Sequence, residues 1–190
     1  MKDDKKTTKS KIFPLDKARA LPLTLTGLVI LVDQIIKGII VKIWPSHPRM
    51  IKDVFNNGFL WIYHVRNKAI AFSLGARVPD SLRPVLFIVL PLLVLGFLFW
   101  YYLSSDEFNK LQRWAMAGII GGGIGNIIDR IFRPDGVVDF ISVNFYGFLG
   151  FDRWPTFNVA DSSVVVCCIL LFLSILISPK KAVVKPGTNA

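Results

Sequence analysis

Apolar residues gather into four long runs along this chain, and each run is long enough to cross a membrane. About 20 helical residues span the hydrocarbon core of a bilayer, and the runs occupy residues 23–44, 84–103, 114–132 and 157–177. The first and third runs contain charged residues, so their assignment also rests on length and flanking sequence. The pattern predicts four transmembrane helices in one integral membrane domain covering residues 1–190.

A stretch between the first two runs predicts a small sheet. Residues 59–65 are rich in aromatic and β-branched side chains, and Asn56-Asn57-Gly58 before them is typical of a turn. The orientation given by the basic residues below places this stretch outside, and Trp and Tyr favour the headgroup layer. We therefore expect this sheet on the outer, periplasmic-side membrane surface. The aromatic loop at 145–151 suits the same layer, with anchoring as the simpler interpretation and substrate contact as the alternative. The predicted fold class is membrane α-helical with a small β-sheet.

The composition agrees with a membrane protein, because 53% of the residues are hydrophobic. The distribution of charge predicts how the chain is oriented in the membrane. The net charge is +10, and the basic residues concentrate beside the runs. They include Lys2, Lys5, Lys6, Lys9, Lys11, Lys17 and Arg19 in the tail at 1–19, Lys110 and Arg113 in the loop at 104–113, and Lys180, Lys181 and Lys185 after the last run. Positively charged flanks stay in the cytoplasm, so both termini are predicted there.

The basic charge has a simple explanation in membrane lipids. No nucleic-acid motif accompanies it, so orientation and anionic headgroups account for it without a nucleic-acid partner. The first run contains Asp33 and Lys37 and lacks a small-residue cleavage site, which indicates a retained span. Cys167 and Cys168 are adjacent within the last run and are interpreted as packing residues.

Polar residues inside the runs fall at helical spacings. Asp33 and Lys37 are four apart and share one face, which fits either an ion pair that fixes packing or support of a site. In the third run, glycines at 118, 121, 122 and 125 allow close approach of a neighbouring helix or a ligand. Asn126, Asp129 and Arg130 follow near its outer end. We expect Asp129 to pair with Arg130 and to matter for stability more than for chemistry.

Two aspartates flank the start of the last run. Asp139 precedes it, and Asp161 lies in its first turn, on one face with Asn158. An ionisable residue at a membrane span indicates a functional site. Two carboxylates that share a proton can hydrolyse a peptide, because the ionised one deprotonates water while the protonated one binds the carbonyl oxygen. A transporter or proton pathway and a non-catalytic scaffold remain as alternatives.

No metal or nucleotide is needed for that chemistry, and no cofactor is predicted. His47 and His64 are isolated, and HExxH, GxSxG and Walker sequences are missing from the chain.

Several blocks in order resemble the lipoprotein signal peptidase family, also called signal peptidase II, over about residues 28–177. The blocks are Asp33-Gln34-x-x-Lys37, Asn67-x-x-x-Ala71-Phe72, the glycines at 122, 123 and 125 running into Asn126-x-x-Asp129-Arg130, Val138-Asp139-Phe140, and Phe157-Asn158-x-Ala160-Asp161-Ser162. The resemblance implies an aspartyl endopeptidase of the bacterial inner membrane that cuts prolipoproteins before a diacylglyceryl-modified Cys. It also implies inhibition by globomycin, and we expect a monomer.

The resemblance further implies roles for individual residues. Asp139 and Asp161 would form the catalytic dyad. Substrate binding or support of the dyad would fall to Asn67, Asn126, Arg130 and Asn158, and stabilisation of the site to Asp33 and Asp129. Two features differ from the usual family pattern. Lys68-Ala69-Ile70 replaces Thr-Gly-Ala after Asn67, and the loop at 143–155 is longer and rich in aromatics. We expect these differences to alter substrate contacts and access.

Overall fold

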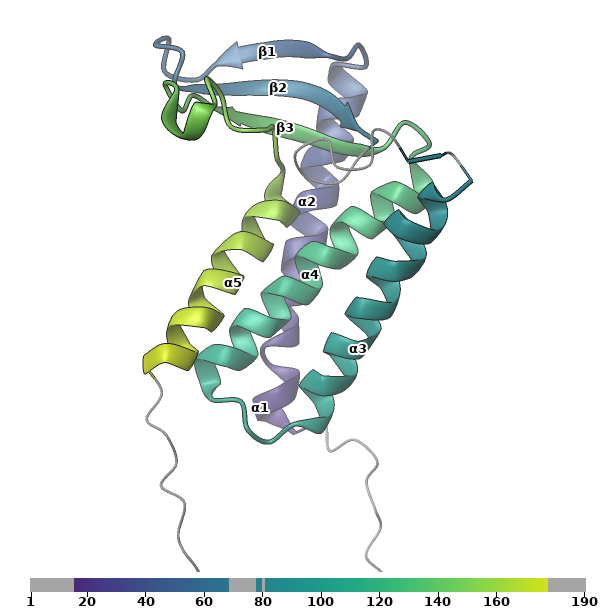
Figure 1. The fold of residues 1–190 in the computed structure, drawn as a ribbon, viewed down its shortest axis with the longest axis vertical. Coiled ribbons are helices and arrows are strands. Elements are labelled where there is room, and N and C mark those ends of the chain that lie inside the picture. Colours follow the sequence, from purple (N-terminus) through teal and green to yellow (C-terminus); the bar gives the residue numbers. More distant parts are fainter. Residues whose placement is uncertain (1–15, 69–77, 80, 178–190) are drawn as a thin grey trace, which may run out of the picture.

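Four long helices form a bundle that carries a three-stranded sheet at one end (Figure 1). The structure is a computed structural model that describes residues 16–68, 78–79 and 81–177. The helices are α1 (Lys17–Ala20), α2 (Leu23–Ile43), the π-helical turn η2 (Val85–Val89) leading into α3 (Leu90–Ser104), α4 (Lys110–Phe132) and α5 (Val159–Ile177). The strands are β1 (Arg49–Asp53), β2 (Leu60–Asn67) and β3 (Val137–Val143). The predicted fold class is confirmed.

Four helices in the described part of the chain are long and apolar enough to cross a membrane. Their bounds differ from the apolar runs mainly at α4, which begins at Lys110 rather than at residue 114. Asn109 caps this helix, since its side chain accepts from the Gln112 amide while the Gln112 side chain accepts from the Asn109 amide. A capping box sets where a helix starts whatever its hydropathy, so the helix extends beyond the apolar run.

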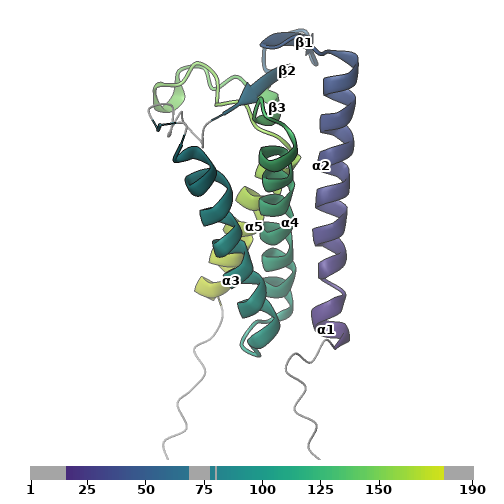
Figure 2. The same cartoon turned by 90° about the vertical axis from the view of Figure 1, so that its right-hand side faces the viewer.

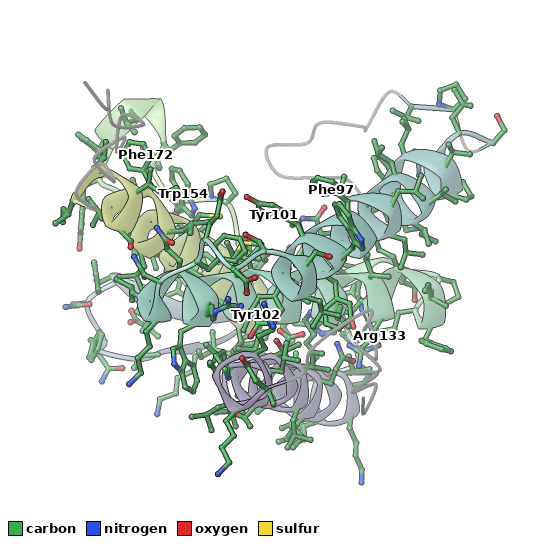
Figure 3. The ribbon with its side chains drawn as sticks, turned by 90° about the horizontal axis from the view of Figure 1, so that it is seen from below. Phe97, Tyr101, Tyr102, Arg133, Trp154 and Phe172 are labelled. Carbon is green, nitrogen blue, oxygen red and sulfur yellow. The ribbon has the colours of Figure 1, made fainter. Side chains whose placement is uncertain are left out.

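Helix α4 lies between the other three long helices, as the view along the bundle in Figure 3 shows. Its glycines permit this position. A Cβ on Gly122 would collide with the Ala160 carbonyl oxygen of α5. A Cβ on Gly121 would lie 3.0 Å from the Thr26 backbone of α2, and one on Gly123 would lie 2.6 Å from Leu95 of α3. The predicted close approach of a neighbouring helix at the glycines is therefore confirmed. Helices α2, α3 and α5 each approach α4 at a glycine.

The sheet is antiparallel in the order β1-β2-β3, and it covers one end of the bundle (Figures 1 and 2). The predicted turn before β2 is present, with Asn56 and Gly58 at positive φ. Strand β2 continues to Asn67, and its register sets Val65 opposite Asp139. The buried Val138 and Phe140 of β3 pack against Ile40 of α2. This contact fixes the sheet to the helix end.

The segment between β3 and α5 folds back along β3. The amides of Phe140 and Ile141 donate to the Phe157 carbonyl at 3.0 and 2.8 Å, and the Phe157 amide donates to the Ile141 carbonyl at 3.0 Å. Arg153 secures the loop by donating to Ser142 and stacking over Trp61, with its guanidinium carbon 3.7 Å from the ring centroid. The start of α5 is thereby held beside β3.

Candidate active site

Asp139 and Asp161 meet where the sheet joins the helix ends. Asp139 lies on β3 with 2% of its surface exposed, and Asp161 lies in the first turn of α5. Asn158 contacts both carboxylates, because its side-chain nitrogen donates to Asp139 Oδ1 at 2.8 Å and its backbone amide donates to Asp161 Oδ2 at 3.2 Å. One residue therefore holds the two acids of different elements together.

The same residue caps α5. Asn158 Oδ1 accepts from the Asp161 amide at 2.9 Å while Asp161 accepts in return from the Asn158 amide, which is the reciprocal arrangement of a capping box. Asp161 consequently sits at the positive end of the helix dipole, where an ionised carboxylate is stabilised. The spacing of these two residues predicts that they share one face, and in the structure they also bond each other.

Two further amides complete the surroundings of the carboxylates. Asn67 Nδ2 donates to Asp139 Oδ2 at 2.9 Å, and Asn126 Nδ2 donates to Asp161 Oδ1 at 2.7 Å. Each of the four carboxylate oxygens thus accepts an N–H, and the donors come from β2, α4 and the start of α5. These bonds fix the orientation of both side chains.

Burial dominates the electrostatics of Asp139. Loss of solvent raises the pKa of Asp139 to about 7, and the nearby charge of Asp161 acts in the same direction. Hydrogen bonds from Asn67 and Asn158 and the charge of Lys37 oppose this rise. Asp139 is therefore a carboxyl group that can carry a proton near neutral pH.

A fully buried ion network lies next to Asp139 and Asp161. Lys37 Nζ lies 2.7 Å from Asp33 Oδ2 and 3.1 Å from Asp129 Oδ2, and it also donates to Asn126 Oδ1 at 3.1 Å. Lys37, Asp33 and Asp129 are 0% exposed. The predicted ion pair between Asp33 and Lys37 is confirmed. Charges buried so completely persist only when they are paired.

The expected pair between Asp129 and Arg130 is wrong. Within the described residues, Asp129 pairs with Lys37 and with Arg133, whose Nη1 lies 3.2 Å from Asp129 Oδ1. Consecutive residues on a helix point in different directions, whereas residues four apart share a face. Arg130 instead lines a cavity together with Asn67, the residue that binds Asp139, and it lies within electrostatic reach of Asp139 and Asp161.

Gln34 and Arg133 also belong to this network, although neither was predicted as a site residue. Gln34 Nε2 donates to Asp129 Oδ1 at 3.1 Å, and Arg133 Nη2 donates to Gln34 Oε1 at 3.4 Å. Figure 3 labels Arg133 near the α2 side of α4. The i,i+4 spacing of Asp129 and Arg133 was the signal that would have identified this arginine.

The cavity has a volume of about 230 Å³ and opens next to Asn67. It is basic and partly apolar, and its lining consists of Asn67, Lys68, Arg83, Pro84, Phe87, Ile88, Arg130, Arg133, Pro134 and Gly136. Of the altered motif after Asn67, the structure describes only Lys68, while residues 69–72 lie outside the described residues. Most of the basic tail and the lysines after residue 177 lie outside them as well.

The described residues contain no group of three or more His, Cys, Asp or Glu side chains that could hold a metal ion. The histidines serve the sheet instead. His64 is buried on β2 with Nδ1 2.7 Å from the Trp44 carbonyl oxygen, and the His47 ring lies 5.3 Å from it between centroids.

Four membrane-length helices with two carboxylates held together at one end define a membrane protein of the aspartic peptidase type. The model of the family described as signal peptidase (SPase) II matches residues 25–177. This chain therefore belongs to the signal peptidase II family.

Similar proteins cover nearly the whole chain. A lipoprotein signal peptidase of Treponema pallidum (strain Nichols) is 38% identical over 179 residues, which is 94% of this chain and 95% of the relative. Lipoprotein signal peptidases of Treponema denticola and Borrelia hermsii are 45% and 43% identical, cover 83% and 82% of this chain, and are each covered over 89% of their length. The predicted family is confirmed.

Solved structures agree with the fold. A bacterial membrane enzyme determined by the in meso method at 2.3 Å resolution superimposes with a TM-score of 0.71 at 27% identity, over 86% of this chain and 93% of the other. A second such structure at 1.9 Å resolution gives a TM-score of 0.70 at 26% identity, over 84% and 95%. With the family established, the activity is that of a signal peptidase, and the transporter and scaffold alternatives are set aside.

Proposed function

We propose that Asp139 and Asp161 are the catalytic dyad with which this enzyme removes signal peptides from diacylglyceryl-modified bacterial prolipoproteins, cutting before the lipidated Cys. The observation that carries the assignment is the bridge of Asn158, which bonds both carboxylates at once. Family membership supports the prolipoprotein substrate.

The two acids divide the chemistry between them. Asp161, at the start of α5, is the ionised member and takes a proton from the attacking water. Asp139, whose pKa is raised to about 7, carries the shared proton and donates a hydrogen bond to the scissile carbonyl oxygen. That proton then passes to the departing amine as the carbon–nitrogen bond breaks, which leaves a carboxylic acid on the signal peptide.

The cavity lined by Asn67 and Arg130 suits the reacting end of this substrate. Asn67 and Arg130 offer hydrogen-bond donors for the peptide carbonyls, and Phe87 and Ile88 offer apolar contact for an acyl chain. A lipid-anchored Cys would hold the scissile bond at the depth of the dyad, which lowers the entropic cost of bringing the reactants together. Lys68 adds a positive charge to the lining of this cavity.

The enzyme resides in the bacterial inner membrane with both termini in the cytoplasm and the sheet on the outer surface. The end of α5 and the loop between α3 and α4 lie together at the end opposite the sheet (Figure 1). We propose that it works as a monomer surrounded by membrane lipids, without a cofactor and without a nucleic-acid partner.

The dyad is tested with Asp139→Asn and Asp161→Asn, purified in detergent and given a diacylglyceryl-modified prolipoprotein in a gel-shift assay. Either change is expected to lower the cleavage rate at least about a hundredfold, because it removes one general acid–base group. Asp152→Asn is the matched control, since Asp152 is an exposed carboxylate of the loop between the two acids. It should cleave at the wild-type rate.

Turnover at the wild-type rate in a folded Asp139→Asn or Asp161→Asn protein would reject the assignment. The unlipidated prolipoprotein is assayed in parallel. Equal cleavage of the unlipidated form would overturn the lipid requirement and leave the dyad standing.

A further inference from the structure

We propose that Lys37 is a positioning residue for both catalytic aspartates. Its three contacts help to set how Asp139 and Asp161 face each other. This inference rests on the dyad proposed above. Among the described residues, Lys37 makes no direct contact with Asp139 or Asp161. Its effect passes through Asp33, Asp129 and Asn126.

The two carboxylates that bind Lys37 each hold the backbone beside one member of the dyad. Asp33 Oδ1 accepts from the amide of Ala160 at 3.0 Å, immediately before Asp161. Asp129 Oδ2 accepts from the amide of Val138 at 3.0 Å, immediately before Asp139. The ammonium of Lys37 joins these two carboxylates, at 2.7 and 3.1 Å. Lys37 therefore joins the segments that carry the dyad, in addition to the bridge that Asn158 makes.

The third contact of Lys37 orients a side chain that binds the dyad itself. Asn126 Oδ1 accepts from Lys37 Nζ and from Asn158 Nδ2, both at 3.1 Å, and Asn126 Nδ2 donates to Asp161 Oδ1 at 2.7 Å. An ammonium group only donates and an ionised carboxylate only accepts, so only one orientation of the amide satisfies both neighbours. Without Lys37, the amide loses one of the two donors that direct its nitrogen at Asp161.

Lys37 also sets the charge of the cluster. The charged groups that face it or the dyad come from four elements: Asp33 on α2, Asp129 and Arg130 on α4 with Arg133 at its C-cap, Asp139 on β3, and Asp161 on α5. With Lys37 there are four carboxylates and three cations, so the cluster is neutral when it holds one proton. Arg66 and Asp135 lie nearby and add one charge of each sign. One retained proton is what a working aspartyl dyad requires.

Replacing Lys37 by Met should therefore retain a second proton in the cluster and leave the dyad without its base. The expected result is a fall in kcat of at least about tenfold and a shift of the acid limb of the pH–rate profile to higher pH by about one pH unit or more. Lys42→Met is the matched control, because Lys42 is an exposed lysine of the same helix. Its profile should match the wild-type profile.

A compensated variant keeps the test decisive if Lys37→Met does not fold. Lys37→Met combined with Asp33→Asn removes both charges of the ion pair, which is far less disruptive than removing one. It leaves three carboxylates and two cations, again neutral with one proton, and the side-chain oxygen of the new amide can still accept from the Ala160 amide. The acid limb should return to its wild-type position while kcat stays reduced, because Asn126 has lost its donor.

A folded double variant with wild-type kcat would overturn the proposal, as would a folded Lys37→Met protein with an unshifted profile. Asp139→Asn is assayed in the same series. If it retains activity, the dyad itself is wrong, and if it is inactive while the Lys37 variants cleave normally, only the positioning role is wrong.

Discussion

Asp139 combines deep burial with two amide donors, and this combination determines how the enzyme should respond to pH. Burial favours the neutral carboxyl and raises the pKa of Asp139 to about 7, whereas the amides of Asn67 and Asn158 stabilise the ionised form and limit the rise. Because its pKa lies near neutrality, Asp139 can hold a proton at neutral pH and can also give it up, as the proposed transfer to the leaving amine requires.

The pH–rate profile should show this proton directly. Because the pKa of Asp139 is raised to about 7, the protonated form predominates below that pH and is lost above it. The rate is therefore expected to be sustained just below neutral pH and to fall by about tenfold per pH unit well above it. Single-turnover cleavage from mildly acidic to mildly alkaline pH tests this expectation, and a rate that keeps rising throughout the alkaline range would contradict it.

The sequence alone singled out the two proposed catalytic aspartates, whereas it missed part of the network that supports them. Asp139 and Asp161 stand out because carboxylates beside membrane spans need a reason to be there. The pairing of Asp129 was missed because neighbouring residues were preferred over the helical spacing of four. The function of Lys37 depends on contacts with residues of α4 that lie far away in the chain, and no local pattern specifies such contacts.

At the scale of elements, the close contact between α4 and α5 holds the first turn of α5, which carries Asp161, in place. Gly122 lies directly against the Ala160 carbonyl oxygen and the Val164 side chain. Ala160 is also the residue whose amide binds Asp33. The first turn of α5 is thus held on one side by a carboxylate and on the other by a helix backbone that carries no side chain at this point.

Gly122→Ala should therefore lower both stability and activity. The added methyl group meets backbone rather than a flexible side chain, so α5 must move, at a cost of about 1–3 kcal/mol. Gly96→Ala is the control, since a Cβ at this position of α3 has open space within 4 Å. Thermal unfolding in detergent should show a lower Tm for Gly122→Ala only, and equal Tm values would argue against a tight contact.

Element boundaries show what a hydropathy pattern omits. Apolar residues revealed all four helices, but α4 starts at Lys110 because Asn109 caps it. The sheet was expected from residues 59–65, whereas its order and the partner strand β3 follow from tertiary packing of Val138 and Phe140 on α2. Helix capping and long-range strand pairing therefore account for most of the differences between the predicted and the observed elements.

At the scale of the whole molecule, the two ends of the bundle differ in chemistry. The sheet end carries Asp139, Asp161 and a loop with exposed apolar side chains, including Phe148 and Leu149 at 65% and 69% exposure. At the other end, Arg19 pairs with Asp106, and Arg113 donates to the Ser105 carbonyl oxygen at 3.0 Å. Arginines occur at both ends, so the proposed cytoplasmic location of this end rests on the basic residues that flank the apolar runs.

Cysteine labelling tests this orientation. In a background without Cys167 and Cys168, Asn57→Cys in the β1–β2 turn should react with a membrane-impermeant maleimide in intact spheroplasts. Glu107→Cys, in the loop between α3 and α4, should react only after the membrane is permeabilised. Both positions are exposed, so accessibility within the fold does not distinguish them. The reverse pattern would invert the proposed topology.

The central position of α4 also affects how the chain enters the bilayer. It is the least apolar of the four candidate spans, and 56% of its most apolar window is buried inside the protein, against 22% or less for the others. Such a helix partitions poorly into lipid by itself, and α2, with Asp33 and Lys37, shares this weakness. We therefore expect α2 and α4 to enter the lipid together, as their polar network assembles. Variants that disturb the network should be recognised by membrane quality-control proteases before any defect in turnover is seen.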